Sequence, residues 1–342
     1  MKKKKSILFT GLFFNYYSGS QKYISEMALY IKKKYPDYNI QITSPYIKEE
    51  IVEHLIKNDI SVVTPDNICN NVPWDIIIAA HHSIINTLLM QKIKYKKIIN
   101  LILSPHINLE NPVYFHKKCS LIVANSEETK QKLIKSNNVI PNKVLVLPNF
   151  LPDEFINIAP SNHQLKKIAI ISNHVPSELK LLPDFLPNIS VDFIGNEYIQ
   201  VNVSPEFLAN YDLIISIGKT VQYALGMKIP VYEYDVFGGC GYINPENFIK
   251  EAELNFSGRA TRRKMSAKEI ANEIINGYSS TIKQISVLQQ MAVKKFSMKN
   301  IDVLLNTIDK QPLTPKIGKL WHIVMLWLSK FSRCKNIPLN KI

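Results

Sequence analysis

Gly218, Lys219 and Thr220 stand together where an apolar run of the sequence ends, and these residue types can bind phosphate. The β-branched run at 213–217 is typical of a buried parallel strand, and residues 221–227 are expected to form a helix before a second strand at 229–232. A glycine turn between strand and helix leaves backbone N–H groups free at the helix N-terminus, where an anion is favoured. Lys219 can neutralise diphosphate charge, and Thr220 can donate its hydroxyl. The alternative is an ordinary strand–helix–strand unit without a ligand.

The residues that follow add further polar candidates. Arg259, with Arg262 and Arg263 after it, supplies planar donors suited to phosphate, although the last two equally suit a solvated basic turn. Glu233 and Asp235 lie at the end of the second strand, where a carboxylate can accept hydrogen bonds from ribose or sugar hydroxyls. Asp235 can also simply cap the next turn. The G-x-x-x-x-G-K-[ST] pattern is absent, so the site is not a Walker A loop.

Histidines follow strands expected in the first half of the chain. The run at 74–80 ends in His81 and His82, and the run at 97–103 is followed by His106. Ligands of open parallel sheets bind beyond the carboxyl ends of strands, and a histidine exchanges protons near neutral pH because its ordinary pKa is about 6.5. The alternative is a structural role in a loop. A zinc site is not indicated, because no Cys/His spacing accompanies these residues.

The elements that must position these residues repeat the same α/β pattern. An apolar strand at 6–14, a polar turn at 15–20 and a helix at 21–34 open the chain, as in nucleotide-binding domains. Strands are expected at 121–124 and 143–147, with a helix at 127–135 that Ser126 caps. The second half begins again with strands at 167–172 and 191–194, which end in Asn173-His174 and Gly195-Asn196. Two helices, 266–276 and 279–296, are expected near its end.

The segment 218–259 resembles the C-terminal half of GT-B glycosyltransferases, in particular the GT4-like enzymes that build bacterial surface polysaccharide. Gly218, Ala224, Pro230 and Val231 fall into register with the pattern E-G-F-G-x-P-x-x-E-A-x-A-x-G-x-P-V, whose glutamates are replaced by Ile215 and Tyr223. A polysaccharide-associated branch carries G-K-T-x-Q-Y, then Y-D-x-F-G-G and N-F-S-G-R. This chain matches that branch at 218–220, 222–223, 234–235, 237–239 and 255–259, and has Val236 where the branch often has histidine.

The resemblance implies a fold and a set of roles. The fold is α/β, with two doubly wound Rossmann-like domains facing across a cleft. The donor would be held by residues of the second domain: Asn173, Gly195, Asn196, Gly218, Lys219, Thr220, Tyr223, Asp235 and Arg259. Gly19, His82 and His106 would lie at the reacting centre, near the acceptor. The resemblance implies neither a metal nor another cofactor, since the nucleotide sugar is a co-substrate. The last helix would return toward the first domain.

Length and composition agree with two domains. The 342 residues, 46% of them hydrophobic, suffice for two cores, expected at 1–150 and 151–310. The four cysteines show no paired spacing, which favours the reducing cytosol, and no cleavable signal peptide or membrane span is indicated.

The net charge of +14 makes nucleic acid and an anionic membrane the obvious partners. Nucleic-acid motifs are absent. The segment 311–342 instead places tryptophans among apolar residues flanked by lysines, which is typical of a helix lying on a membrane surface. A helix packed on the protein is the alternative.

Together these features predict a cytoplasmic glycosyltransferase, peripheral at the inner membrane face. It would move a sugar from a nucleotide sugar to a glycan or lipid-linked acceptor, without metal. Two alternatives remain: a GT-B-fold nucleotide-sugar epimerase, and a non-catalytic nucleotide-binding or membrane-bound partner of a polysaccharide assembly complex.

Overall fold

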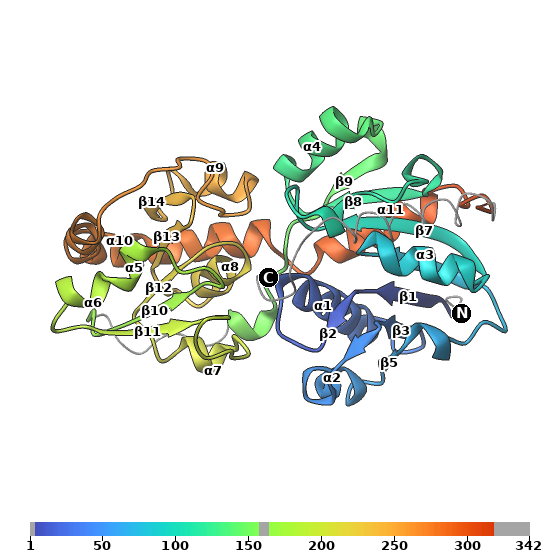
Figure 1. Cartoon of the computed structure of the whole chain (residues 1–342), viewed down its shortest axis with the longest axis horizontal. Helices are drawn as coiled ribbons and strands as arrows, with labels where there is room; N and C mark the ends of the chain where they lie inside the picture. The colour runs from blue at the N-terminus through green and yellow to red at the C-terminus, as the bar shows by residue number, and fades with distance from the viewer. Residues whose placement is uncertain (1–3, 157–163, 318–342) are drawn as a thin grey trace, which may run out of the picture.

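The structure, a computed structural model, describes residues 4–156 and 164–317. Two α/β halves lie side by side, each built around its own sheet (Figure 1). Their apolar strands are buried on both faces, as parallel strands covered by helices must be.

The N-terminal half contains a parallel sheet of seven strands in the order β5-β3-β1-β6-β7-β8-β9. Its strands are β1 (Ser6–Thr10), β3 (Asn39–Thr43), β5 (Ser61–Val63), β6 (Trp74–Ala79), β7 (Tyr95–Ile102), β8 (Leu121–Ala124) and β9 (Val144–Val146). Its helices are α1 (Gly19–Lys34), α2 (Glu49–Ile56), α3 (His82–Met90) and α4 (Glu127–Asn137), and β2 (Phe13–Phe14) pairs with β4 (Tyr46–Ile47). Strand order reverses between β1 and β6, so the loops after these strands diverge and leave room for a ligand.

The C-terminal half contains a sheet of five strands in the order β11-β10-β12-β13-β14. Its strands are β10 (Lys167–Ile171), β11 (Ser190–Ile194), β12 (Leu213–Ser216), β13 (Val231–Asp235) and β14 (Gly238–Tyr242), of which β14 is antiparallel. Its helices are α5 (Ser177–Lys180), α6 (Leu182–Phe185), α7 (Pro205–Leu208), α8 (Lys219–Gly226), α9 (Phe248–Glu253) and α10 (Ala267–Lys295). The order reverses here between β10 and β12, which precede Asn173 and Gly218 respectively.

The chain passes twice between the halves, and the two passages lie together. The backbone N–H of Leu151 donates to the carbonyl of Phe296 at 2.8 Å. After the second passage, α11 (Asn300–Lys310) packs Ile301, Leu304 and Ile308 into the N-terminal core. This return of the last helix was expected from the sequence. It means that α11, within the segment 151–310 assigned to the C-terminal domain, packs with the N-terminal one.

Two expectations about secondary structure were wrong, and one strand was not predicted. The strand expected at 6–14 is interrupted at Gly11, where a Cβ would lie 2.7 Å from the Phe14 ring. The two helices expected at 266–276 and 279–296 are one helix, α10. Gly277 lies within this helix, and the Tyr242 ring packs where a side chain at that position would lie. Strand β14 was not expected, because its sequence, GGCGY, lacks a strand pattern.

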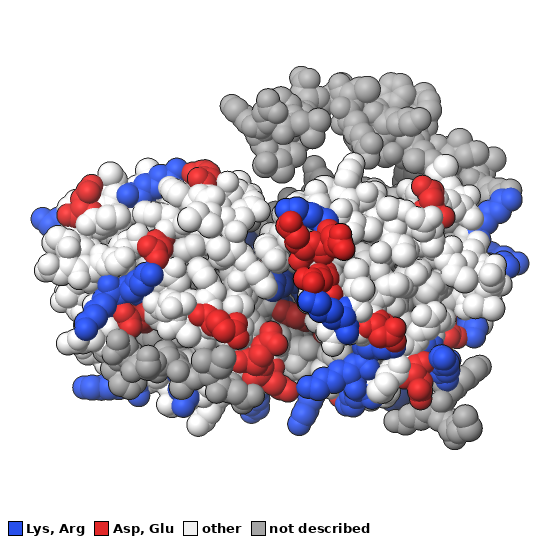
Figure 2. All heavy atoms as spheres, turned by 90° about the horizontal axis from the view of Figure 1, so that it is seen from below, with Lys and Arg blue, Asp and Glu red and all other residues white. Residues whose placement is uncertain are grey.

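The predicted membrane-surface segment falls almost entirely on 318–342, outside the described residues. In the part of the segment that the structure describes, the Thr314 hydroxyl accepts from the Ile98 backbone N–H at 2.8 Å and the Ile317 N–H donates to the Tyr95 hydroxyl at 3.2 Å, so the chain runs along the N-terminal half up to residue 317. Within the described ranges, no helix is both long and apolar enough to cross a bilayer. The face drawn in Figure 2 carries lysine and arginine interspersed with aspartate and glutamate, and shows no continuous basic patch.

Candidate active site

A cleft with a cavity volume of about 150 Å³ lies between the two halves. The N-terminal half contributes the start of α1 and the turn before it: Tyr17, Ser18, Gly19 and Lys22. The C-terminal half contributes the exits of β10, β11 and β12 with the first turns of α8: Ile171, Asn173, Ile194, Gly195, Asn196, Gln200, Val201, Val203, Lys219, Thr220 and Tyr223. The cleft therefore opens at the carboxyl ends of both sheets, where open α/β sheets bind ligands.

Two helix N-termini border this cleft. Ser18 caps α1 and accepts from the Gln21 backbone N–H at 3.2 Å. Gly218 caps α8 with φ of 64°, a left-handed conformation that favours glycine and turns the chain sharply from β12 into the helix. Its own N–H is used by the Phe256 carbonyl, so Lys219 and Thr220 begin the donor-rich end of α8. Two such ends on one cleft make it attractive to an anion.

Seven of the residues predicted for donor or acceptor binding line this cleft. They are Gly19, Asn173, Gly195, Asn196, Lys219, Thr220 and Tyr223. Gly218 adjoins it as the cap of α8. The other four, His82, His106, Asp235 and Arg259, are not among its lining residues. Their roles as binding or catalytic residues remain predictions.

Lys219 is engaged by the N-terminal half. Its ammonium lies 2.5 Å from Oε2 of Glu26, and the other oxygen of Glu26 accepts from the Tyr223 hydroxyl. The rings of Tyr23, Phe150 and Tyr223 surround the ammonium at 5.2 to 5.9 Å from their centroids. Burial lowers the pKa of Lys219, and Glu26 opposes that effect.

Lys22 supplies another cation to the cleft, and sequence reasoning missed it. Its ammonium donates to the side-chain carbonyl of Asn202, a neutral partner, and burial lowers its pKa. The spacing of residues in the sequence could have indicated it. Lys22 and Glu26 lie one and two turns beyond Ser18 on one face of α1, directly after the polar turn at 15–20.

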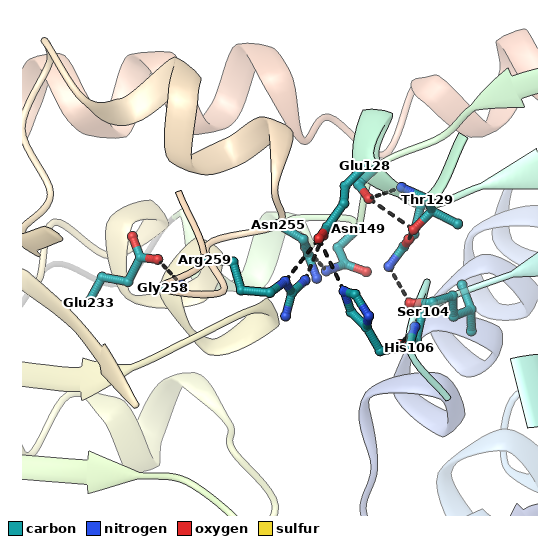
Figure 3. A network of polar contacts seen from close by, with 12 residues as sticks. Ser104, His106, Glu128, Thr129, Asn149, Glu233, Asn255, Gly258 and Arg259 are labelled. Atoms are coloured by element: carbon teal, nitrogen blue, oxygen red, sulfur yellow. Dashed lines mark hydrogen bonds and ion pairs between the residues drawn. The ribbon is translucent and has the colours of Figure 1, made fainter. Parts of the chain in front are cut away.

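A second polar network joins the halves beside the cleft (Figure 3). Arg259 donates from Nε and Nη2 to the two carboxylate oxygens of Glu128 at 2.9 and 2.6 Å, and His106 Nε2 lies 3.2 Å from Oε1 of the same carboxylate. Burial opposes ionisation of Glu128, but the Arg259 and His106 hydrogen bonds leave its pKa lowered. Asn149 donates to Asn255 at 2.9 Å in the same region. Arg259 therefore spans to the N-terminal half in this conformation.

The remaining candidates are held by neighbouring groups of their own half. Asp235 accepts from the Ser172 hydroxyl and from the N–H of Val236, so it caps the turn after β13, and burial raises its pKa. Nδ1 of His82 lies 3.1 Å from the Leu109 carbonyl, and burial lowers its pKa. His81 accepts from the Leu12 N–H.

No family model and no curated protein matches the chain. Solved structures do. The complex of Anabaena HepE with UDP and glucose covers 88% of this chain and 98% of its own, with a TM-score of 0.60 and 15% identity. A complex of a S. aureus TarM mutant with fondaparinux, alpha-GlcNAc-glycerol and UDP covers 90% of this chain and 100% of its own, with a TM-score of 0.61 and 11% identity. The structure of a UDP-GlcNAc 2-epimerase from Neisseria meningitidis bound to UDP-GlcNAc covers 90% of this chain and 100% of its own, with a TM-score of 0.55 and 12% identity.

These likenesses define the class of fold. The chain has the GT-B fold, with two Rossmann-like domains meeting at a cleft, as the sequence predicted. At such low identity the likeness establishes the fold and not the reaction.

Proposed function

We propose that this protein is a glycosyltransferase that moves a sugar from a nucleotide-sugar donor to a glycan or lipid-linked acceptor in surface polysaccharide synthesis. The main support is that one interdomain cleft collects Lys22, Lys219, Thr220 and the first turns of two helices. These groups suit a diphosphate, which carries the charge of the departing nucleotide. HepE, TarM and the epimerase, which share the fold, were all solved with UDP or a UDP-sugar.

In the proposed reaction, the bond between the anomeric carbon and the diphosphate breaks, and an acceptor hydroxyl forms the new bond. Charge develops on the leaving diphosphate, so preorganised N–H groups and ammonium groups accelerate the step without reorganising. Gly195 and Asn196 would face the base or ribose, and Gly19 the donor sugar. The proposal assigns charge neutralisation to these protein groups and no role to a metal, so adding Mg²⁺ or Mn²⁺ should leave turnover unchanged.

Filling the cleft tests this site. Gly19 lines the cleft, and a Cβ added to it meets no atom within 4 Å, so Gly19→Leu adds an apolar side chain at the cleft wall without straining the backbone contacts of α1. We expect calorimetry with UDP, GDP and CMP to show binding of one nucleotide to the native protein and its loss in Gly19→Leu. Lys33→Leu, at an exposed position of the same helix, is the matched control. Equal binding by both variants, or no nucleotide binding by the native protein, contradicts the site.

A nucleotide-sugar epimerase is the second candidate, because two matched structures carry that description. The two reactions differ in their need for an acceptor. Incubation with the binding nucleotide sugar alone, followed by NMR of the sugar, should leave the donor unepimerised, and adding lipid-linked glycan acceptors should release the nucleotide. Epimerised sugar formed without acceptor would favour the epimerase.

The proposal also places the protein at the inner face of the cytoplasmic membrane. The basis is the composition of 311–342, in which Trp321 and Trp327 stand among apolar residues flanked by lysines. The full chain should sediment with anionic vesicles and not with neutral ones, and a chain ending at residue 317 should do so less. Equal sedimentation of both chains would contradict a role for this segment.

A further inference from the structure

Away from the nucleotide cleft, Glu233, Cys240 and Glu251 form a buried cluster, here called the Glu–Cys–Glu cluster. The three residues come from β13, β14 and α9, and one ligand atom of each lies within 4.8 Å of the others. Both glutamates are 0% exposed, and Cys240 is largely buried. The sequence did not suggest a metal here, because the residues are 7 and 11 positions apart and follow no familiar ligand spacing.

Glu251 is not satisfied by the protein around it. Both of its carboxylate oxygens are inaccessible, and among the described residues no N–H, hydroxyl or thiol donates to either one; the carboxyl group of Glu233, itself part of the cluster, is the group within hydrogen-bonding reach. A buried carboxylate without a partner is strongly unfavourable, so such a group binds a proton or a cation.

The spacing of the cluster fits a small divalent ion. Zinc binds thiolate sulfur at about 2.3 Å and carboxylate oxygen at about 2.0–2.2 Å in a tetrahedral arrangement, which puts sulfur and oxygen ligands about 3.5 Å apart. Sγ of Cys240 lies 3.4 Å from Oε2 of Glu233. Only small side-chain adjustments are therefore needed for both atoms to reach one ion.

The ligand set selects the kind of cation. Two carboxylates and a thiolate carry three negative charges, and a thiolate favours zinc over magnesium or calcium, which prefer oxygen alone. The groups around the ligands are arranged to support them: the Gly258 N–H donates to Oε1 of Glu233, and Nδ2 of Asn247 lies 3.5 Å from Cys240 Sγ. Such outer contacts orient ligands and tune the metal.

We propose that the Glu–Cys–Glu cluster supplies three ligands to one Zn²⁺ ion with a structural role, and that a water molecule is the fourth ligand. The ion would join β13, β14 and α9, and through Glu233 it would fix the segment 255–259. That segment needs fixing: Asn255, Phe256 and Gly258 have φ values of 57°, 49° and 73°. Figure 3 shows Glu233 bonded to Gly258, with Arg259 reaching from the next position to Glu128. The ion would thus help to hold the interdomain contact in place, independently of the proposed sugar transfer.

Cobalt provides a direct test, because a thiolate bound to Co²⁺ gives a charge-transfer absorption band. The full chain, stripped with EDTA, should develop this band with one equivalent of Co²⁺ and lose it when Zn²⁺ is added. Zn²⁺ should also raise the melting temperature. The absence of a thiolate band in folded native protein overturns the proposal and leaves a carboxyl pair that shares a proton.

Two variants and a matched control locate the ion. Cys240→Ser should abolish the band, and Glu251→Gln should weaken Co²⁺ affinity at least tenfold. Cys69→Ser, at an exposed cysteine, should retain both the band and the affinity. A band that persists in Cys240→Ser, or that disappears in Cys69→Ser, places the metal elsewhere and overturns the assignment. If Cys240→Ser does not fold, the affinity of Glu251→Gln for Co²⁺ still decides the question: an unchanged affinity overturns the assignment.

Discussion

The ammonium of Lys219 and the carboxylate of Glu26 meet across the domain boundary at 2.5 Å, with 9% and 11% of their side chains exposed. The Tyr223 hydroxyl donates to the same carboxylate, so one acidic residue of α1 satisfies two residues of α8. A buried pair of this kind is costly to break, since removal of one partner leaves an uncompensated charge.

This contact predicts strong coupling between the two residues. Glu26→Gln and Lys219→Met should each lower the free energy of unfolding by about 3 kcal/mol, and the double variant should lose much less than the sum. Urea denaturation of the native protein, the two single variants and the double variant gives the coupling energy of the pair. Additive losses would show that the pair contributes nothing as a unit.

Lys22 should contribute more to nucleotide affinity than its absence from sequence motifs suggests. Its hydrogen-bond partner is the neutral Asn202, whereas Lys219 is paired with a carboxylate. A charge-assisted hydrogen bond is worth about 1.5–3 kcal/mol, so Lys22→Ala should raise the Kd of the bound nucleotide about tenfold or more. Titration calorimetry checks this, with Lys33→Ala as the exposed control on the same helix. An unchanged Kd in Lys22→Ala would remove Lys22 from the site.

Local signals in the sequence predicted much of the fold and of the donor side of the cleft. Gly218 after an apolar strand, and Ser126 before two glutamates, each marked a helix start that the structure contains. Parallel strands bring their carboxyl ends to one edge, so the exits carrying Asn173 and Gly195 were expected to meet.

Contacts between distant residues were not predictable in the same way. Glu26 and Lys219 are 193 positions apart, and Glu128 and Arg259 are 131 apart. No local pattern encodes which charges meet across the domains, because that depends on how two separately packed sheets are oriented. The sequence therefore indicated Lys219 and Arg259 as free phosphate ligands, whereas the structure shows both paired with carboxylates.

The Glu128–Arg259 pair should make stability depend on pH in the acidic range. The pKa of Glu128 in the folded chain lies below its ordinary value of 4.5, so the ionised form contributes stability above that value. This contribution is lost as pH falls through the folded pKa. The difference in unfolding free energy between native protein and Glu128→Gln should therefore shrink as the pH falls below about 4.5.

Glu53→Gln is the control for this experiment, because Glu53 forms an exposed pair with Lys57 within one helix. Such pairs contribute little, so its effect should be small at every pH. A Glu128→Gln difference that does not change with pH would show that folding leaves the pKa of Glu128 unchanged.

Replacing His106 should lower the rate of turnover. It lies in the loop after β7 beside Glu128, and half of its side chain is exposed. If it faces the reacting centre, as predicted, His106→Ala should lower kcat about 100-fold with little change in donor KM. His54→Ala, at an exposed histidine of α2 that has no predicted role in the site, is the control and should leave kcat unchanged. Equal losses in the two variants would point to a structural cause.

Gly277→Ala should destabilise the protein, although replacing a glycine within a helix by alanine usually stabilises it. In an exposed helix interior, Gly→Ala stabilises by about 1 kcal/mol. A Cβ at Gly277, however, would lie 2.7 Å from two carbons of the Tyr242 ring, whose hydroxyl is fixed by the Ile274 carbonyl at 2.8 Å. The ring therefore cannot move away cheaply, and Gly277→Ala should destabilise by about 1–3 kcal/mol. Thermal and urea unfolding check the sign, with Ser279→Ala at an exposed position of α10 expected to change little or to stabilise slightly. Stabilisation by Gly277→Ala would mean that α10 does not pack tightly against β14. The contact with the Tyr242 ring would then not explain why a glycine stands at position 277.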